Sequence, residues 1–119
     1  MRLLPPVFWR LLLAITGVVV LTMALLPNPP EVPIDNDKYR HMLAFGTLTI
    51  LSVAAYPSTP LLRIGERLSF LGAMIEVVQS IPALHRDCDI MDWVADTAVI
   101  IGVLLVVALV RGRRPSSAI

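Results

Sequence analysis

Residues 90–110 read IMDWVADTAVIIGVLLVVALV, and this stretch decides what kind of fold the chain adopts. Asp92 and Asp96 lie near its start, and after them every residue but Thr97 is apolar. The apolar residues are continuous rather than alternating with polar ones, which favours a buried or lipid-facing helix over a strand with one polar face. A helix crosses the hydrocarbon core of a bilayer with about 20 predominantly apolar residues. The stretch therefore predicts a transmembrane helix.

The composition of the whole chain agrees with this prediction. Of its 119 residues, 56% are hydrophobic and only 16% are charged, whereas a soluble domain carries about 25% charged residues. The net charge is +1. These values argue against an ordinary soluble domain, a disordered chain and a nucleic-acid-binding protein. The single cysteine, Cys88, gives no information on redox compartment.

Three further apolar runs precede residues 90–110, and the proline-rich segments 27–33 and 57–60 separate them because proline interrupts helices. We predict an all-α, polytopic membrane protein, a bundle of four transmembrane helices over about residues 8–26, 38–56, 66–84 and 90–110. Residues 61–67 are expected to form an amphipathic stub at the interface. Residues 1–110 would form one membrane domain, and residues 111–119 a basic cytoplasmic tail. A cleaved signal peptide is the alternative for the first run, and buried core helices are the alternative for the short second and third runs.

The basic residues predict the orientation, because lysine and arginine concentrate in the cytoplasmic loops of membrane proteins. With both ends inside, the cytoplasmic segments hold seven basic residues and the outer ones three. The seven are Arg2, Arg10, Arg63, Arg67, Arg111, Arg113 and Arg114, and the three are Lys38, Arg40 and Arg86. We therefore predict an N-in, C-in, multi-pass protein of the bacterial inner membrane.

Polar side chains of three predicted helices fall toward the outer side of the membrane in this topology. Residues three, four and seven apart share a helix face, which defines three polar stripes. These are Lys38, His41 and Phe45; Gly72, Glu76 and Gln79; and Asp89, Asp92 and Asp96. An ionisable side chain within a span costs about 2.5–3.5 kcal/mol on insertion scales and usually faces the bundle interior and a partner. We expect the stripes to converge on an outward-facing polar pocket.

Nine residues are candidates for ligand binding: Asp37, Lys38, His41, Glu76, Gln79, Arg86, Asp89, Asp92 and Asp96. Of these, His41, Glu76 and Asp92 are also candidate catalytic groups. Structural roles compete with binding for several of them. Asp89 and Asp92 suit the N-terminus of a helix, Lys38 and Arg40 can reach the headgroups, and Arg86 can serve as a counter-ion. Glu76 and Asp96 lie deeper in the apolar zone, which favours a functional role.

No metal site or cofactor is assigned from the sequence. His85 and Cys88 lie close together but form no zinc-binding motif, and the chain has no phosphate-binding loop or nucleophile elbow. His41 with Glu76, Asp92 and Asp96 could in principle hold a divalent cation through imidazole and oxygen ligands, but spacing alone does not show the geometry. Four glycines, Gly17, Gly46, Gly72 and Gly102, are expected at close contacts between helices.

The chain resembles the VanZ-like family of small bacterial membrane proteins. The resemblance rests on Asp37-Lys38-x-x-His41-x-x-x-Phe45, Glu76-x-x-Gln79 and Arg86-x-x-Asp89-x-x-Asp92, which occur in this order between residues 37 and 102. The chain departs from the family pattern at Asp96, where relatives usually have Asn, and at Val99, where they have Gly. The resemblance implies a four-helix integral membrane protein. The founding member of the family is associated with low-level resistance to the glycopeptide teicoplanin.

Three functions are consistent with these observations. The first is binding of a lipid headgroup or a cell-envelope precursor, with a link to glycopeptide susceptibility. The second is a membrane-embedded hydrolase or transferase that acts on a lipid-linked substrate through His41 and carboxylates. The third is a small proton-coupled carrier that uses Glu76 and Asp96. A polar cluster with a purely structural role remains an alternative to all three, and the expected partners are membrane lipids and, in a homo-oligomer, further copies of the chain.

Overall fold

A computed structural model describes residues 4–25, 37–81 and 90–112, with the side chains of Asp37 and Lys38 left out. Within these residues the chain forms four helices, α1 (Pro6–Leu25), α2 (Asp37–Ala55), α3 (Leu61–Gln79) and α4 (Ile90–Gly112). The described part is all-helical, as predicted. Prolines mark the helix boundaries, since Pro6 opens α1 and Pro60 lies immediately before α3.

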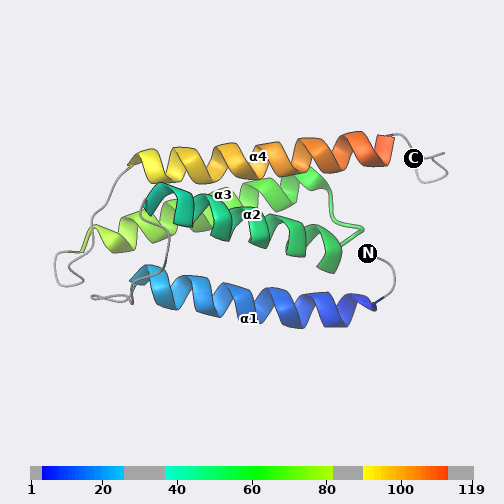
Figure 1. Cartoon of the computed structure of the whole chain (residues 1–119), viewed down its shortest axis with the longest axis horizontal. Coiled ribbons are helices and arrows are strands. Elements are labelled where there is room, and N and C mark those ends of the chain that lie inside the picture. The colour runs from blue at the N-terminus through cyan, green and yellow to red at the C-terminus, as the bar shows by residue number, and fades with distance from the viewer. Residues whose placement is uncertain (1–3, 26–36, 82–89, 113–119) are drawn as a thin grey trace.

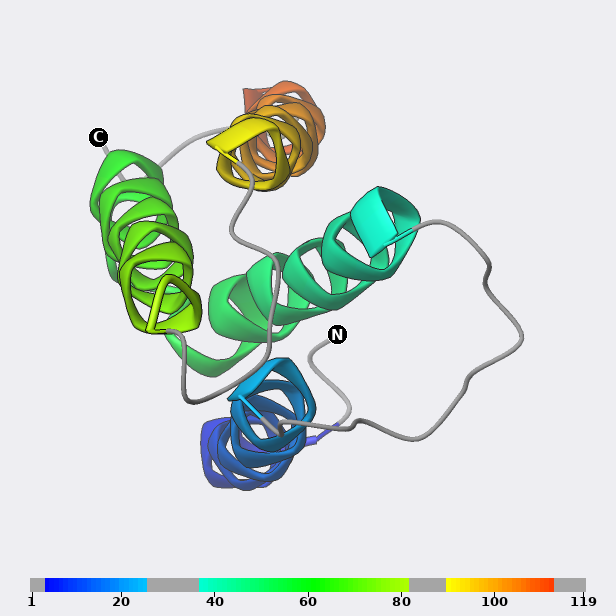
Figure 2. The same cartoon turned by 90° about the vertical axis from the view of Figure 1, so that its left-hand side faces the viewer.

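Successive helices run in opposite directions, so that the start of α1 and the end of α4 lie at the same end of the bundle (Figure 1). Helix α2 contacts all three other helices, and α3 packs mainly on α4. Viewed along the bundle, α1 and α4 lie on opposite sides of α2 (Figure 2). This order brings together the C-terminal ends of α1 and α3 and the N-terminal ends of α2 and α4.

Helix α3 corrects two sequence predictions. It begins at Leu61, directly after Pro60, and ends at Gln79, whereas the sequence predicted a separate stub over residues 61–67 and a span over 66–84. The stub belongs to the helix because Ile64 and Leu68 are buried on the same face as Gly72 and Ile75. Residues 82–84 lie outside the described residues.

Among the described helices, α1 and α4 are long and apolar enough to cross a membrane. Their apolar side chains are largely exposed, and α1 has no buried residue. Helices α2 and α3 also present apolar side chains outward, among them Leu43 and Ile50 on α2 and Phe70 and Val77 on α3. The surface of the bundle is therefore apolar on every helix.

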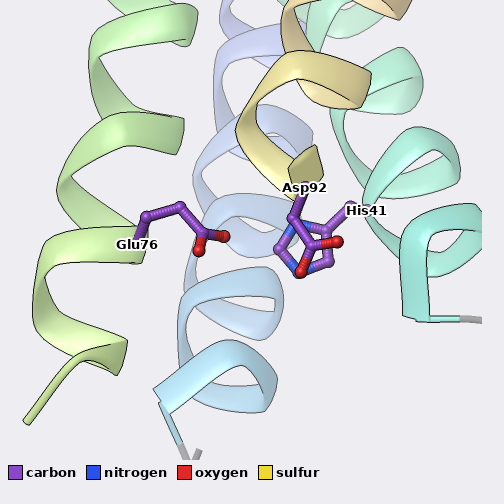
Figure 3. A group of neighbouring side chains, drawn as sticks. All are labelled: His41, Glu76 and Asp92. Carbon is purple, nitrogen blue, oxygen red and sulfur yellow. The ribbon is translucent and has the colours of Figure 1, made fainter. Parts of the chain in front are cut away.

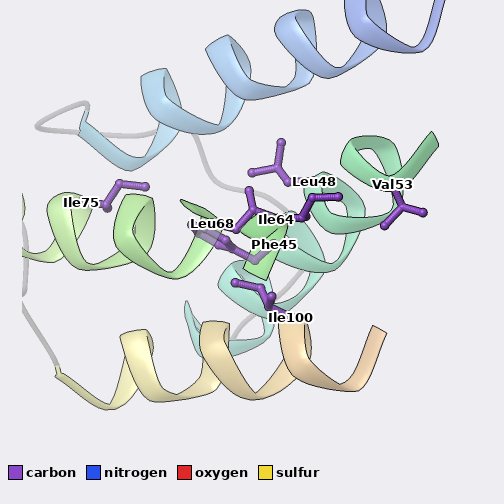
Figure 4. Packing of buried hydrophobic residues seen from close by; sticks show 7 residues of the cluster. All are labelled: Phe45, Leu48, Val53, Ile64, Leu68, Ile75 and Ile100. Carbon is purple, nitrogen blue, oxygen red and sulfur yellow. The ribbon is translucent and has the colours of Figure 1, made fainter. Parts of the chain in front are cut away.

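The apolar interior is small and lies where α2, α3 and α4 meet. Seven side chains form it: Phe45, Leu48, Val53, Ile64, Leu68, Ile75 and Ile100 (Figure 4). Side chains of α1 such as Val20 and Leu21 cover it from outside. The packing of these side chains against one another joins α2, α3 and α4.

The glycines behave differently from the prediction. An added Cβ at Gly72 would lie 3.3 Å from Asp96 Oδ2 and 3.4 Å from Trp93 Cδ1, so that α3 and α4 do approach closely there. At Gly17, Gly46 and Gly102 an added Cβ would meet no described atom within 4 Å, which makes the prediction wrong for these three. The second close contact is instead at Gly65, where an added Cβ would lie 2.9 Å from Leu104 Cδ1.

Candidate functional site

Four ionisable side chains are buried where the helix ends described above come together. Asp96 is 0% exposed, Asp92 3%, Glu76 4% and His41 8%. His41 comes from the start of α2, Glu76 from the end of α3, and the two aspartates from the start of α4. With Gln79, which is also buried, these residues form what we call the polar cluster. It lies toward one end of the bundle, with the apolar interior beside and beyond it.

His41 lies between two carboxylates of α4. Its Nδ1 atom is 3.2 Å from Asp96 Oδ2, and its Nε2 atom is 4.0 Å from Asp92 Oδ2. The first distance is that of a hydrogen bond, in which a protonated Nδ1 donates to the carboxylate, and the second is too long for one. Asp96 therefore fixes the orientation of the ring and turns Nε2 toward Asp92.

Glu76 approaches the same place from α3. One ligand atom each from His41, Glu76 and Asp92 can be chosen so that all three atoms lie within 4.8 Å of one another. The Glu76 side chain points toward the imidazole and the Asp92 carboxylate (Figure 3). An imidazole and two carboxylates at this spacing can bind a cation, share protons or orient a polar ligand.

Gln79 joins the polar cluster to α1. Its Nε2 donates a 2.8 Å hydrogen bond to the Ala24 carbonyl in the last turn of α1, where the helix has no internal donor for its carbonyls. The Oε1 atom of Gln79 is buried and has no hydrogen-bond partner among the described residues, and neither has Oδ1 of Asp96. Buried polar atoms without partners are uncommon in folded proteins and call for an explanation.

Hydrogen bonds between α3 and α4 hold the aspartates in place. Trp93 Nε1 donates to the Ser69 carbonyl at 3.0 Å, and the hydroxyls of Ser69 and Thr97 lie 3.0 Å apart. Trp93, Ser69 and Thr97 were not predicted to take part. The one available signal was spacing, since Trp93 and Thr97 follow Asp92 and Asp96 by one residue each, on the flank of the same stripe.

The structure brings together five of the nine candidate residues, namely His41, Glu76, Gln79, Asp92 and Asp96. Asp37 and Lys38 lie in the first turn of α2, and their side chains are outside the described part. Arg86 and Asp89 lie outside the described residues altogether, as do His85 and Cys88. The described cluster is accordingly acidic, with three carboxylates to one imidazole.

Basic side chains lie at the opposite end of the bundle. Arg10, Arg63, Arg67 and Arg111 come from the start of α1, the start of α3 and the end of α4. Arg10 donates from Nε to the Ala55 carbonyl at 3.1 Å, and its guanidinium lies 4.6 Å from the centre of the Tyr56 ring. We call these four residues the basic end.

Comparisons with known proteins add no assignment, because no family model, curated protein or solved structure matches the chain.

Proposed function

We propose that the chain is an integral membrane protein in which all four helices cross the bilayer. The observation that carries this proposal is the inverted polarity of the bundle. Large apolar side chains such as Val18 and Phe70, each 64% exposed, cover its surface, whereas His41 and three carboxylates are buried inside. Soluble proteins show the reverse, since their charged groups are almost never fully buried and they rarely expose large apolar patches.

The lower hydropathy of α2 and α3 does not oppose four spans. Their buried polar groups, among them Thr49 and Ser52 of α2, face the interior, and their outward side chains are apolar. Tyr39 and Tyr56, 61% and 41% exposed, flank α2. The helical rise places them about 25 Å apart, close to the thickness of the hydrocarbon core, and tyrosines are enriched at the two membrane interfaces.

Contacts of α1 at both of its ends support a helix that stays part of the bundle. The Arg10–Ala55 hydrogen bond joins it to α2, and the Gln79–Ala24 hydrogen bond joins it to α3. The four arginines of the basic end lie at the end of the bundle where α1 starts and α4 ends. The positive-inside rule places this end in the cytoplasm and so favours an N-in, C-in orientation. The polar cluster then lies in the outer half of the membrane, which in a bacterium is the side of the cell envelope.

At that position, the polar cluster is suited to bind the polar group of a lipid or of a lipid-linked envelope precursor. Ionisable groups within a membrane are costly and mark functional sites. The motifs that resemble the VanZ-like family contribute four members of the cluster, His41, Glu76, Gln79 and Asp92. We therefore extend the proposal to a role in the envelope that affects susceptibility to glycopeptides such as teicoplanin.

The experiment compares His41→Ala and Glu76→Ala with Glu66→Ala in cells that lack the native gene. Glu66 is an exposed carboxylate of the same helix as Glu76, toward the basic end, and serves as the matched control. Teicoplanin susceptibility is measured at equal protein abundance in the membrane. We expect the first two variants to behave like the deletion strain and the control to behave like the wild type. Unchanged susceptibility in both cluster variants at normal abundance would overturn the envelope role.

A hydrolase or transferase is the second candidate, and one observation favours it. His41 is oriented by Asp96 on one side and presents Nε2 on the other, as a general base with an orienting carboxylate does. Purified protein would then turn over lipid-linked phosphates, and His41→Ala would abolish the turnover. A proton-coupled carrier is less well supported, because the buried ionisable side chains of the described residues all lie toward one end of the bundle.

A further inference from the structure

We propose that His41, Glu76 and Asp92 are the ligands of one divalent transition-metal ion, with zinc the best match. Asp96 does not bind the ion in this proposal. It is a positioning residue that holds the imidazole of His41 in the orientation needed for binding. The three ligand residues lie on three different helices, so a bound ion would also fasten α2, α3 and α4 to one another.

The spacing of the three side chains suits a shared ion. Zinc–nitrogen and zinc–oxygen bonds of about 2.0–2.2 Å place two tetrahedral ligand atoms roughly 3.4 Å apart. The Nε2–Oδ2 distance between His41 and Asp92 is 4.0 Å, and the three ligand atoms lie within 4.8 Å of one another. Rotation of the carboxylate side chains can bring their oxygens to the shorter separation that a shared ion requires. In Figure 3 the Glu76 carboxylate already points toward the other two groups.

Asp96 completes the arrangement that metal-binding histidines usually have. Such a histidine donates its second ring N–H to a carboxylate or carbonyl, which fixes the tautomer and leaves the other nitrogen as the ligand. His41 Nδ1 lies 3.2 Å from Asp96 Oδ2, so Nε2 is the nitrogen left for the metal. The other oxygen of Asp96, Oδ1, is buried without a hydrogen-bond partner among the described residues, so the described protein groups leave part of this carboxylate's hydrogen-bonding capacity unused.

The chemistry of the three side chains also suits a metal ion. His41, Glu76 and Asp92 are all buried, with their ligand atoms grouped in one place, and coordination of a metal is one way in which buried carboxylates are accommodated. An imidazole ligand favours zinc and similar metals over magnesium and calcium, which prefer oxygen ligands alone. Three protein ligands also leave a fourth tetrahedral position open.

The open position gives the site its ligand class, and this step rests on the proposed function. An acidic cluster by itself repels a phosphate, whereas a metal ion within it attracts one. We infer that the fourth position takes an anionic oxygen, the phosphate or pyrophosphate of a lipid or of a lipid-linked precursor. With the metal bound, an acidic cluster can therefore bind an anionic headgroup.

The test measures zinc binding to the full chain, purified in detergent with an affinity tag free of histidine and stripped of metal. All proteins carry Cys88→Ser, which removes a competing thiolate. Titration calorimetry and elemental analysis are expected to give one zinc ion per chain. Glu76→Gln is expected to lose this binding, and Glu66→Gln, the matched control on the same helix, to keep it. Asp96→Ala is expected to weaken binding by about 10- to 100-fold, as the loss of an outer partner does.

Two outcomes would overturn the metal site. One is zinc binding to the parent protein that is no tighter than binding to Glu76→Gln, and the other is equal loss of binding in Glu66→Gln. If Glu76→Gln does not fold, cobalt substitution in the parent protein decides instead, since the proposal requires a visible spectrum typical of tetrahedral nitrogen and oxygen ligands. The headgroup step is tested separately, by whether inorganic phosphate alters that spectrum. Zinc binding with unchanged teicoplanin susceptibility would overturn the envelope role and leave the metal site intact.

Discussion

The Nδ1 atom of His41 lies 3.2 Å from Oδ2 of Asp96, although the two residues are 55 positions apart in the chain. The contact joins the start of α2 to the start of α4 in a place where both side chains are buried. It makes Asp96 the residue that orients the imidazole. An asparagine at position 96 would still offer an oxygen to His41.

We predict that Asp96→Ala destabilises the protein and that Asp96→Asn does so much less. Alanine leaves a buried ring N–H without an acceptor, which costs about 1–3 kcal/mol, whereas asparagine keeps a carbonyl oxygen in reach. Thermal unfolding in detergent, followed by circular dichroism, measures the difference. Equal unfolding temperatures for the two variants would show that the hydrogen bond does not stabilise the fold.

Gly72→Ala is predicted to destabilise the bundle, because the new methyl group would press on Asp96 Oδ2 and Trp93 Cδ1 at 3.3 and 3.4 Å. Overpacking of this kind costs roughly 1–3 kcal/mol. Gly102→Ala is the control, since its added Cβ meets no described atom within 4 Å, and it should unfold at or above the wild-type temperature. A drop for Gly102→Ala as large as for Gly72→Ala would contradict the close approach of α3 and α4 at Gly72.

Arg10→Lys is predicted to lower the unfolding temperature even though it keeps the positive charge. Lysine has no Nε–H in the position that donates to the Ala55 carbonyl and no planar group to stack on Tyr56. A hydrogen bond and a cation–π contact at an exposed site are each worth about 0.5–1 kcal/mol. If Arg10 acted only through its charge in setting the orientation, Arg10→Lys would unfold like the wild type.

Labelling with a membrane-impermeant maleimide distinguishes four spans from two. With four, Cys88, between α3 and α4, is labelled in intact cells. In the Cys88→Ser background, Ser58→Cys, between α2 and α3, is then labelled only after the cells are permeabilised. If α1 and α4 alone crossed the membrane, both positions would lie on the same side. Labelling of Ser58→Cys in intact cells would therefore exclude the proposed topology.

The helices were predictable because hydropathy and proline positions are local properties of the chain. The continuous apolar run predicted α4 from residue 90, and Pro57 and Pro60 separated α2 from α3. The start of α3 was mispredicted because Arg63, Glu66 and Arg67 look like the edge of a span. The buried Ile64 and Leu68 between them extend the helix back to Leu61.

The glycines show where local reasoning ends. Gly72 and Gly102 look alike in the sequence, since each lies within an apolar helix. Only Gly72 faces another helix at close range. Gly65 was overlooked because charged residues surround it, yet it lies against Leu104. Which face of a helix meets a neighbour depends on how both helices are rotated, and the sequence of either one does not contain that rotation.

The sequence by itself determined the helices, the apolar surface and the stripes that carry His41, Glu76 and Asp92, because helical periodicity assigns residues three and four apart to one face. Only the tertiary structure decided that Asp96 contacts Nδ1 of His41, that Asp92 lies nearer Nε2, and that Glu76 reaches the same place from α3. The physical reason is that distances between helices depend on crossing and rotation, which the side chains at contacts such as Gly72 determine. Spacing along the chain predicted which residues would face inward, and packing selected which of them meet.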